Sequence, residues 1–250
     1  MGNTIEISDL RKSYGGRVVN AIPKLTLGTH AIEGLIGPNG AGKTTLLSLI
    51  TGRVPADAGE ITFKSGDQSV SLTNRRLDDV ARLGVVRTNQ RIQDFESLTI
   101  MDSILLCLAD DRQEKILGLF KEKALRSSAL PVVSKYIDQF RFSNPNGHAL
   151  SAGEKKLLDI LRCILLKPKF LLMDEPTGGL PNEQTDMVID LVRKVSDETG
   201  MSVVIIEHDL ELIWSACEYV HFLSDGEVLF QGTPADVRTN EIVRQKYMGE

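Results

Sequence analysis

The sequence is poor in cysteine, and this shortage restricts what the protein can be. Its three cysteines, Cys107, Cys163 and Cys217, lie far apart and form no Cys-x-x-Cys pair. Each falls in an apolar stretch with a helical pattern, so we expect buried, reduced thiols. Such thiols are typical of a protein from a reducing compartment.

Long apolar runs are also missing. The longest uninterrupted one, Ile104 to Ala109, is much too short to cross a bilayer, which takes roughly 20 residues. The first residues lack the basic and apolar regions of a secretory signal, and we expect none. If the protein associates with a membrane, we expect a partner to hold it there.

The chain has no strong excess of charge of either sign. Its 250 residues carry a formal net charge of -5, which argues against nucleic-acid binding driven by bulk charge. The sequence shows no internal repeats, no low-complexity segment and no linker between two globular halves. This length is sufficient for a large core, and on length alone one α/β domain with a subdomain is as well supported as two domains.

What the sequence does contain is a phosphate-binding pattern, Gly-x-x-x-x-Gly-Lys-Thr. The apolar run before it, Ile32 to Ile36, predicts a buried strand, and Leu46 to Ile50 predicts a helix. A glycine-rich loop between a strand and a helix is the context in which this pattern binds phosphate. The residues of the loop are Gly37, Pro38, Asn39, Gly40, Ala41, Gly42, Lys43, Thr44 and Thr45.

The residue types in this loop suit a nucleotide. Gly37, Gly40 and Gly42 let the backbone curl and come close to a ligand, so that loop and helix N–H groups form an anion site. We expect Lys43 to reach the β- and γ-phosphates and the Thr44 hydroxyl to ligate Mg²⁺. The alternative, a glycine turn that happens to contain a lysine, is disfavoured by the strand–loop–helix context.

Two neighbouring carboxylates end another predicted strand. The apolar run from Phe170 to Met173 leads directly to Asp174 and Glu175. Beside a phosphate loop, the first acid suits a role linked to Mg²⁺, and the second suits a base that positions the attacking water. The alternative is a pair of exposed acids at a strand end.

The roles of three further side chains cannot be decided from the residue types and their spacing alone. Tyr14 follows an early strand and is either a stacking platform for a base or an ordinary turn tyrosine. Gln90 follows a short apolar strand and either serves Mg²⁺ and water or is a loop amide facing solvent. His208 follows the buried run Ser202 to Ile206, at the edge where parallel sheets bind ligands, although a lone histidine is usually structural.

Ser151 and Glu154 have the spacing of a helix capping box, in which each side chain satisfies the other residue's backbone N–H. The helix is predicted to continue to about Leu166, before Pro168 stops it. Capping alone would explain both residues without any function.

The middle of the chain changes character, because apolar residues recur at helical spacing there with no strand pattern between them. The helical stretches are 100–109, 114–125 and 131–140. We therefore predict one α/β domain over 1–250, with its core in 1–92 and 150–250 and a helical subdomain at about 93–149. The core is predicted to be a P-loop NTPase fold with a mostly parallel sheet and an N-terminal antiparallel β subdomain.

The order of these motifs resembles that of the nucleotide-binding domain of an ABC ATPase, over essentially the whole chain. The motifs in question are the phosphate loop, Gln90, the stretch Leu150 to Glu154, the stretch Leu171 to Thr177, and His208. By this resemblance, Tyr14 stacks on adenine, Gln90 links Mg²⁺ to the helical subdomain, and His208 contacts the γ-phosphate. Asp174 is the Walker B aspartate and Glu175 is the catalytic base.

The resemblance also implies a dimer that binds ATP and Mg²⁺ between two head-to-tail subunits. The signature of one subunit, here Ser151, Ala152, Gly153 and Glu154, completes the ATP site of the other. A helix beginning there presents its dipole and free N–H groups to a γ-phosphate. The implied catalytic residues are Lys43, Gln90, Glu175 and His208, and the implied metal ligands are Thr44, Gln90 and Asp174.

Two of the departures from the family pattern bear on the ATP sites. The usual signature is Leu-Ser-Gly-Gly-Gln, whereas Ala152 adds a methyl group where close approach to phosphate is needed. Pro181 stands where the family usually has an aspartate, and proline supplies neither a carboxylate nor a backbone N–H. We expect hydrolysis to survive with weakened coupling between the two ATP sites.

Several stretches resemble one branch of the family, the ATP-binding subunits of branched-chain amino-acid and urea importers. These stretches are Arg87 to Gln90, Ile206 to Asp209, and the tail from Gly232 to Glu250; lipopolysaccharide-export ATPases share a similar tail. The branch implies transmembrane permease subunits, a second ATPase that is a copy or a paralogue, and indirectly a solute-binding protein. It places the chain on the cytoplasmic face of the cell membrane, with the permease docked on Arg91 to Leu105.

The alternative is a soluble ABC ATPase with no transport role, such as an iron–sulfur cluster assembly subunit. The stretches Gly153 to Lys156 and Asp159 to Leu161 are similar to that class. The importer-like tail and the sequence Glu175-Pro176-Thr177 favour transport.

Overall fold

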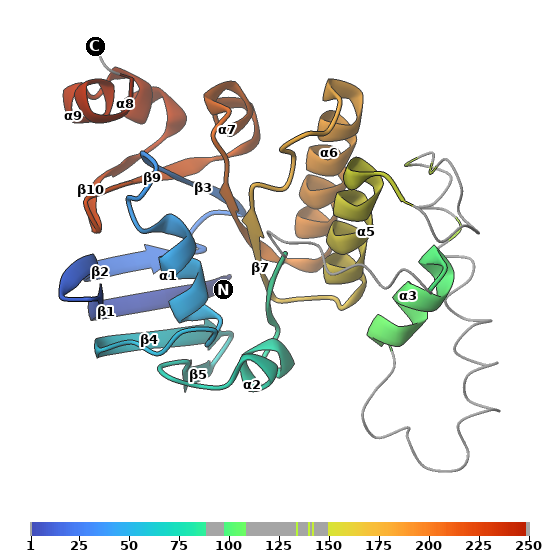
Figure 1. The fold of residues 1–250 in the computed structure, drawn as a ribbon, viewed down its shortest axis with the longest axis horizontal. Helices are drawn as coiled ribbons and strands as arrows, with labels where there is room; N and C mark the ends of the chain where they lie inside the picture. The colour runs from blue at the N-terminus through green and yellow to red at the C-terminus, as the bar shows by residue number, and fades with distance from the viewer. Residues whose placement is uncertain are drawn as a thin grey trace.

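Two β-sheets and the helices packed on them make up the part of the chain that the structure describes. The structure is a computed structural model, and it describes residues 2–88, 98–108, 134, 140, 142 and 150–248 (Figure 1). For residues 105–108 and 248 the description covers the backbone alone.

The first sheet is antiparallel, as predicted for the N-terminal part of the chain, with the strand order β2-β1-β4-β5. Its strands are β1 (Asn3–Tyr14), β2 (Arg17–Leu27), β4 (Ala58–Ser65) and β5 (Gln68–Ser71). Ile5 pairs with Phe63 and Ile7 with Ile61 across β1 and β4, and all four side chains are buried. The sheet therefore turns an apolar face towards the core.

The second sheet has six strands in the order β10-β9-β3-β8-β7-β6, all parallel except β10. The strands are β3 (Ile32–Ile36), β6 (Val85–Arg87), β7 (Phe170–Asp174), β8 (Ser202–Ile206), β9 (Tyr219–Ser224) and β10 (Glu227–Gly232). Every residue of β3, β7 and β8 is buried. This is the pattern of parallel strands whose two faces are both covered.

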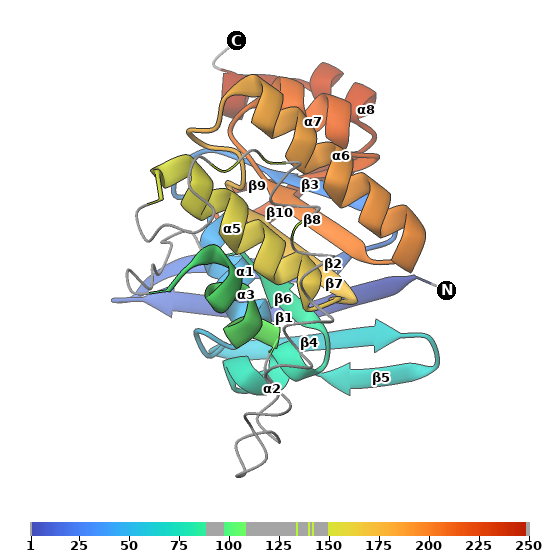
Figure 2. The same cartoon turned by 90° about the vertical axis from the view of Figure 1, so that its right-hand side faces the viewer.

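Helices cover both faces of this six-stranded sheet (Figure 2). The helices are α1 (Lys43–Ile50), α2 (Leu77–Arg82), α3 (Ile100–Leu108), α5 (Ala152–Leu165), α6 (Asn182–Thr199), α7 (Leu210–Ala216), α8 (Pro234–Thr239) and α9 (Glu241–Val243), followed by the π-helical turn η2 (Arg244–Met248). Leu46 of α1 belongs to the core between the two sheets, together with Leu172 of β7. Leu157 of α5 belongs to the core on the opposite face, with the adjacent Leu171, because successive residues of a strand point to opposite sides.

The predicted P-loop NTPase fold class is confirmed by this arrangement. The first predicted helical stretch of the insertion corresponds to α3. The stretch 114–125 and nearly all of 131–140 lie outside the described residues. Residues 91–97 of the predicted permease-docking segment, Arg91 to Leu105, lie outside them as well. The division into a core and a helical subdomain therefore stays a prediction.

Two of the three cysteines, Cys163 and Cys217, are buried thiols, as predicted. Burial, together with the charge of Glu33, raises the pKa of Cys217 to about 12, which makes this thiol unreactive. The side chain of Cys107 lies outside the described residues. None of the helices in the described ranges combines the length and the apolar character that crossing a membrane requires.

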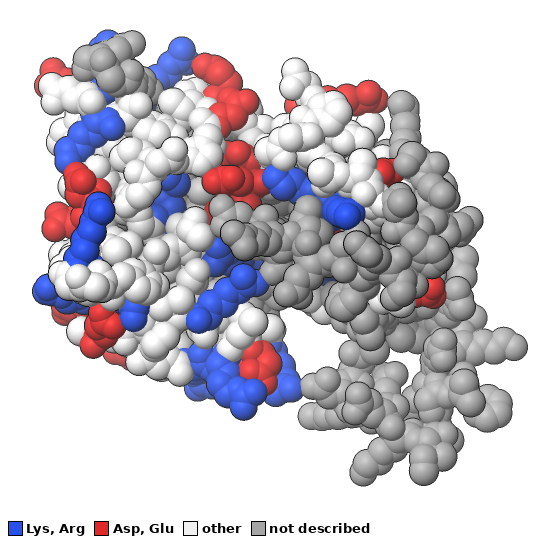
Figure 3. Space-filling model, viewed as in Figure 1, with Lys and Arg blue, Asp and Glu red and all other residues white. Residues whose placement is uncertain are grey.

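Charged side chains of both signs are mixed over the face in Figure 3, and Lys and Arg gather at its lower edge, where α2 lies. The exposed basic residues of this stretch include Arg75, Arg76 and Arg82. Nitrogen atoms of Arg76 and Arg82 lie 3.2 Å and 3.8 Å from the carboxylate of Asp78, so the basic cluster is partly neutralised by its own helix.

A buried carboxylate lies near the amino end of β3, far along the strand from the phosphate loop. Glu33 accepts hydrogen bonds from the backbone N–H groups of Gly28 and His30, at 2.8 Å and 2.9 Å, and lies 3.0 Å from His221 Nε2. Burial alone raises the pKa of a carboxyl group. Here the hydrogen bond and charge of His221, together with the two backbone N–H groups, outweigh burial and lower the pKa of Glu33 from 4.5 to about 2.

This shift predicts a specific loss of stability in acid. Because the folded-state pKa lies below the unfolded one, ionised Glu33 stabilises the fold above about pH 4.5, and this contribution disappears as the pH falls towards about 2. Denaturant unfolding of Glu33→Gln should show about 2 kcal/mol less acid destabilisation between about pH 6 and about pH 3 than the wild type. Asp190→Asn, which removes an exposed carboxylate of α6, is the control for lost charge. Equal pH slopes for Glu33→Gln and the wild type would contradict the prediction.

Candidate functional site

The phosphate loop encloses a hollow of about 270 Å³ at the carboxyl edge of the six-stranded sheet. Loop residues, one residue of β2 and two residues that follow β7 and β8 line it together. These residues are Val19, Asn39, Gly40, Ala41, Gly42, Lys43, Thr44, Thr45, Glu175 and His208. The structure thus brings the loop, the second acid and the histidine together.

Two glycines of the loop are required by close backbone contacts. Gly37 has φ 154°, and a Cβ built there would lie 1.9 Å from the carbonyl oxygen of Leu223. Gly42 has φ 103°, and its Cβ would lie 2.6 Å from the carbonyl oxygen of Val19. Any side chain at either position would force the loop away from the sheet, so the glycines fix its curvature.

Lys43 is the first residue of α1, and its ammonium group is folded back onto the loop. Nζ donates to the carbonyl oxygens of Gly37, at 2.6 Å, and Pro38, at 3.0 Å. Burial lowers the pKa of Lys43, while the charges of Glu175 and Asp174 oppose that shift. The helix cap, Gly42, has no side chain to accept from the first N–H groups of α1, which leaves them available to an anion.

Asp174 ends β7 with only 2% of its surface exposed. Its Oδ2 accepts from Arg87 Nη2 at 2.5 Å, and its backbone N–H donates to Thr88 Oγ1 at 3.1 Å. Its Oδ1 is buried and has no hydrogen-bond partner among the described residues. An unpaired buried carboxylate oxygen is costly, so this atom fits an interaction with a cation or the water bound to one.

Glu175 and His208 form a pair beside the loop. Glu175 Oε1 lies 2.9 Å from His208 Nε2. Glu175 adopts φ 50°, a strained conformation for a residue with a side chain, and its N–H donates to Ile206 O at 2.9 Å. With the backbone in this conformation, the two consecutive carboxylates lie in different environments: Asp174 is buried, and Glu175 lines the hollow.

Sequence reasoning missed Glu207, which organises this corner of the site. Its buried carboxylate accepts from the backbone N–H and the hydroxyl of Thr177, at 2.8 Å and 2.7 Å, and from the N–H of His208 at 3.2 Å. Glu207 therefore joins the segment after Glu175 to the segment that carries His208. The available signal was an acidic residue directly after a fully buried strand.

The signature residues lie elsewhere in the same chain. Ser151 caps α5, with Oγ accepting from the Glu154 N–H at 3.2 Å and Glu154 Oε2 accepting from the Ser151 N–H at 2.9 Å. The predicted capping box is thus present. Ser151 and Ala152 are exposed, Gly153 is half-buried beside Leu180, and none of the four lines the hollow of this chain.

The remaining predicted side chains are Tyr14 and Gln90. Tyr14 ends β1 with 48% of its surface exposed and is not among the residues that line the hollow. Its ring instead lies under the ammonium of Lys12, 5.3 Å from the ring centre. Gln90 lies outside the described residues.

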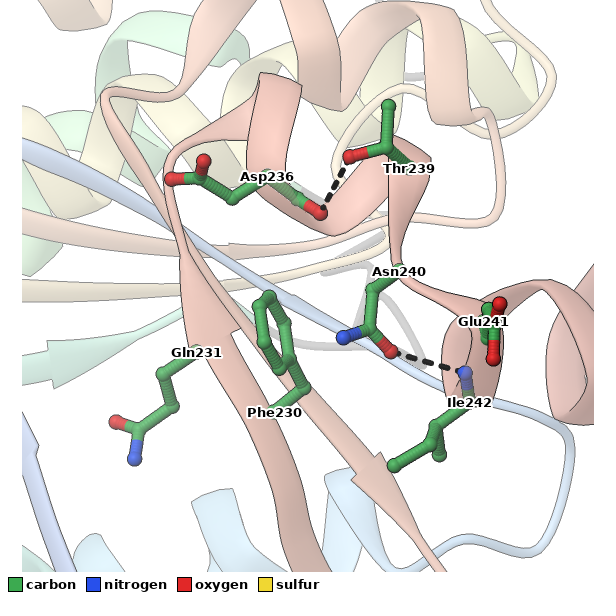
Figure 4. Close-up of a pocket in the computed structure, with 7 residues that line it drawn as sticks. All are labelled: Phe230, Gln231, Asp236, Thr239, Asn240, Glu241 and Ile242. Atoms are coloured by element: carbon green, nitrogen blue, oxygen red, sulfur yellow. Dashed lines mark hydrogen bonds between the residues drawn. The ribbon is translucent and has the colours of Figure 1, made fainter.

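A second hollow, of about 550 Å³, lies between β10 and the helices α8 and α9 (Figure 4). Two of its polar side chains make local hydrogen bonds: Asn240 Oδ1 accepts from the Ile242 N–H at 3.0 Å, and Thr239 Oγ1 donates to Asp236 O at 3.2 Å. None of the predicted site residues lines it. The chemistry therefore belongs to the phosphate-loop hollow.

Comparison with known proteins agrees with the geometry. The family model described as ABC transporter matches residues 22–178. The chain is 32% identical to the high-affinity branched-chain amino acid transport ATP-binding protein BraF of Pseudomonas aeruginosa, with 98% of each chain covered. It is also 32% identical to the lipopolysaccharide export system ATP-binding protein LptB of Escherichia coli K12, over 99% of this chain and 98% of that protein.

The fold is similar to that of a solved ABC cassette, the ADP conformation of MJ1267, an ATP-binding cassette of an ABC transporter. The two share 24% sequence identity, with a TM-score of 0.80 and 100% of both chains covered. The family match and the full-length similarity confirm the family inferred from the order of the motifs: the chain belongs to the ABC transporter family, as an ATP-binding subunit and an ATPase.

Proposed function

We propose that the phosphate-loop hollow binds ATP with Mg²⁺ and hydrolyses it with Glu175 as the base, to power solute import through a membrane permease. The observation that carries this proposal is the pair formed by Glu175 and His208, 2.9 Å apart, beside the loop that holds Lys43. A base and a histidine bonded to each other at a phosphate site match the needs of phosphoryl transfer to water.

The loop binds the phosphates of ATP in this proposal. N–H groups from Gly40 to Thr45 surround the phosphate oxygens, next to Pro38 and Asn39 at the start of the loop. The Lys43 ammonium exchanges the carbonyl oxygens of Gly37 and Pro38 for phosphate oxygens. Tyr14, exposed at the end of β1, stacks on the adenine.

Thr44, Asp174 and Gln90 are the residues that would hold Mg²⁺, which when bound neutralises charge on the β- and γ-phosphate oxygens. The unpartnered Asp174 Oδ1 supports this choice. Glu175 accepts a proton from the water whose oxygen attacks the γ-phosphorus, as the bond to the bridging oxygen of ADP breaks. His208 holds the Glu175 carboxylate at Oε1 and is placed to reach the γ-phosphate.

The chain supplies half of each ATP site. Among the signature residues at the start of α5, Ser151 and Ala152 are exposed, and none of Ser151 to Glu154 lines the hollow of its own chain. We place them against the ATP of a second subunit, a copy or a paralogue, with the helix N–H groups directed at its γ-phosphate. Hydrolysis removes this link, and the two subunits separate.

The proposed cargo is a branched-chain amino acid, urea or a similar small polar solute. The similarity to BraF and the importer-like tail support it. Permease subunits and a solute-binding protein complete the assembly, with this subunit on the cytoplasmic face of the membrane. The equal identity to LptB favours lipopolysaccharide export as the second candidate.

Replacing the base should trap ATP. Glu175→Gln removes the proton acceptor but keeps the size of the side chain, so ATP turnover should fall about 10²- to 10⁴-fold. The nucleotide should then hold two subunits in a stable dimer, detected by size-exclusion chromatography with Mg²⁺ and ATP. Glu198→Gln, on the exposed face of α6, is the matched control and should leave turnover unchanged. Undiminished turnover in Glu175→Gln would rule out its role as base.

Pro181 provides a test of coupling between the two sites. It caps α6 without a side-chain bond, and the loop before it is tied to the signature helix through Lys156 Nζ and Gly178 O, 2.8 Å apart. Pro181→Asp should raise the Hill coefficient of ATP hydrolysis with little change in turnover. Asp and Asn cap helices equally well, so Pro181→Asn controls for the added cap, which contributes about 1 kcal/mol. If Pro181→Asp changes neither rate nor cooperativity, or Asn has the same effect on cooperativity, the coupling role is wrong.

Affinity purification from native membranes in mild detergent tests the transport role. We expect polytopic membrane proteins to co-purify with the tagged chain, together with a second ATPase or a solute-binding protein. A solute-binding protein among them would favour import over export. Recovery of soluble assembly proteins, or of no partner, would move the chain to the non-transport ABC ATPases.

A further inference from the structure

A buried arginine connects three elements next to the proposed Mg²⁺ site. Arg87 is the last residue of β6, at the edge of the six-stranded sheet, and only 4% of its side chain is exposed. Its Nη1 donates to Ser48 Oγ on α1 at 2.9 Å, and its Nη2 donates to Asp174 Oδ2 on β7 at 2.5 Å. Its carbonyl oxygen also accepts from Cys163 Sγ on α5 at 3.8 Å.

These contacts continue to the start of the phosphate-loop helix. Ser48 Oγ, which accepts from Arg87, itself donates to the carbonyl oxygen of Thr44 at 2.7 Å. A chain of hydrogen bonds thus runs from Thr44 through Ser48 and Arg87 to Asp174. Its two ends are the two described residues that we assign to Mg²⁺, and they come from different elements, α1 and β7.

Arg87 uses only part of the Asp174 carboxylate. Oδ2 is bound by the guanidinium, whereas Oδ1, also buried, has no partner among the residues that the structure describes. Arg87 Nε is likewise buried and has no partner among the described residues. A buried ion pair of this kind contributes little net stability compared with an apolar pair, because two charges must leave water. Its geometry, rather than its contribution to stability, therefore indicates its role.

We propose that Arg87 is a positioning residue, which fixes Asp174 relative to the Thr44 turn and occupies one carboxylate oxygen so that the other serves Mg²⁺. This inference rests on the proposed Mg²⁺ roles of Thr44 and Asp174. Arg87 touches neither nucleotide nor metal in this role and acts through Asp174 and Ser48. The arginine fork is needed because two acceptors on different elements must be bound at once, which the single ammonium of a lysine does less well.

Three variants separate the parts of this network. Arg87→Gln removes the charge and the fork, and Arg87→Lys keeps the charge alone. Ser48→Ala leaves the ion pair intact and breaks only the link to α1, so it tests the network even if the loss of Arg87 prevents folding. Arg82→Gln, on the exposed helix α2, is the matched arginine control.

The measurement is the affinity of the full-length protein for a fluorescent ATP analogue, with and without Mg²⁺, together with Mn²⁺ binding followed by electron paramagnetic resonance. Arg87→Gln should weaken the Mg²⁺-dependent gain in affinity and the binding of Mn²⁺ about tenfold, as for residues that orient metal ligands. Affinity without Mg²⁺ should stay within about twofold. Ser48→Ala and Arg87→Lys should fall between wild type and Arg87→Gln, and Arg82→Gln should match the wild type.

Two results would contradict the inference, and they can be told apart. If Arg87→Gln or Ser48→Ala lowers the melting temperature but keeps the wild-type dependence on Mg²⁺, or binds the metal more tightly, Arg87 is a structural ion pair and the inference is wrong. If Mg²⁺ has no effect on nucleotide binding by the wild type, the proposed Mg²⁺ site is wrong. The inference about Arg87, which depends on that site, is then wrong as well.

Discussion

The constraint on which the site depends is the register of four neighbouring parallel strands. In the order β3-β8-β7-β6, each strand delivers its functional residues at its carboxyl end: the phosphate loop, His208, the two acids and Arg87. Direct pairing of Asp174 with Ile206 places Glu175 next to the segment that carries His208. A slip of one residue would turn each of these side chains to the other face and would separate the groups that line the site.

Several charged groups buried inside this apolar scaffold are held by hydrogen bonds to other segments. Glu33 near one end of β3, Glu207 after β8 and the pair of Arg87 with Asp174 are examples. Each joins segments that are distant in sequence, and each would be costly if one partner were lost. The polar interior therefore specifies how the strands and loops meet, while the apolar side chains supply the general drive to fold.

Local patterns in the sequence were sufficient for the phosphate loop, the buried strands and the capping box of Ser151, because each depends on residues that are neighbours in the chain. The partners of Arg87 could not be predicted, since Asp174 lies 87 positions away and nothing local marks it as the acceptor. Glu207 was missed for the same reason, with Thr177 30 positions away. The roles of Tyr14 and Gln90 were chosen by resemblance; the structure does not bring Tyr14 to the hollow, and Gln90 lies outside the described residues.

In the structure, carbonyl oxygens of the loop occupy the ammonium group of Lys43 that a phosphate would bind. Lys43 Nζ is already desolvated and held by the carbonyl oxygens of Gly37 and Pro38, while Gly37 and Gly42 hold the backbone in its curved form. When a phosphate binds, its charged oxygens would therefore replace the neutral carbonyl oxygens as hydrogen-bond acceptors of the Lys43 ammonium group. Because folding has already ordered the loop, binding a phosphate costs little further conformational entropy. The preference of the loop for a phosphate over water therefore depends on the negative charge of the phosphate and not on a change in the shape of the loop.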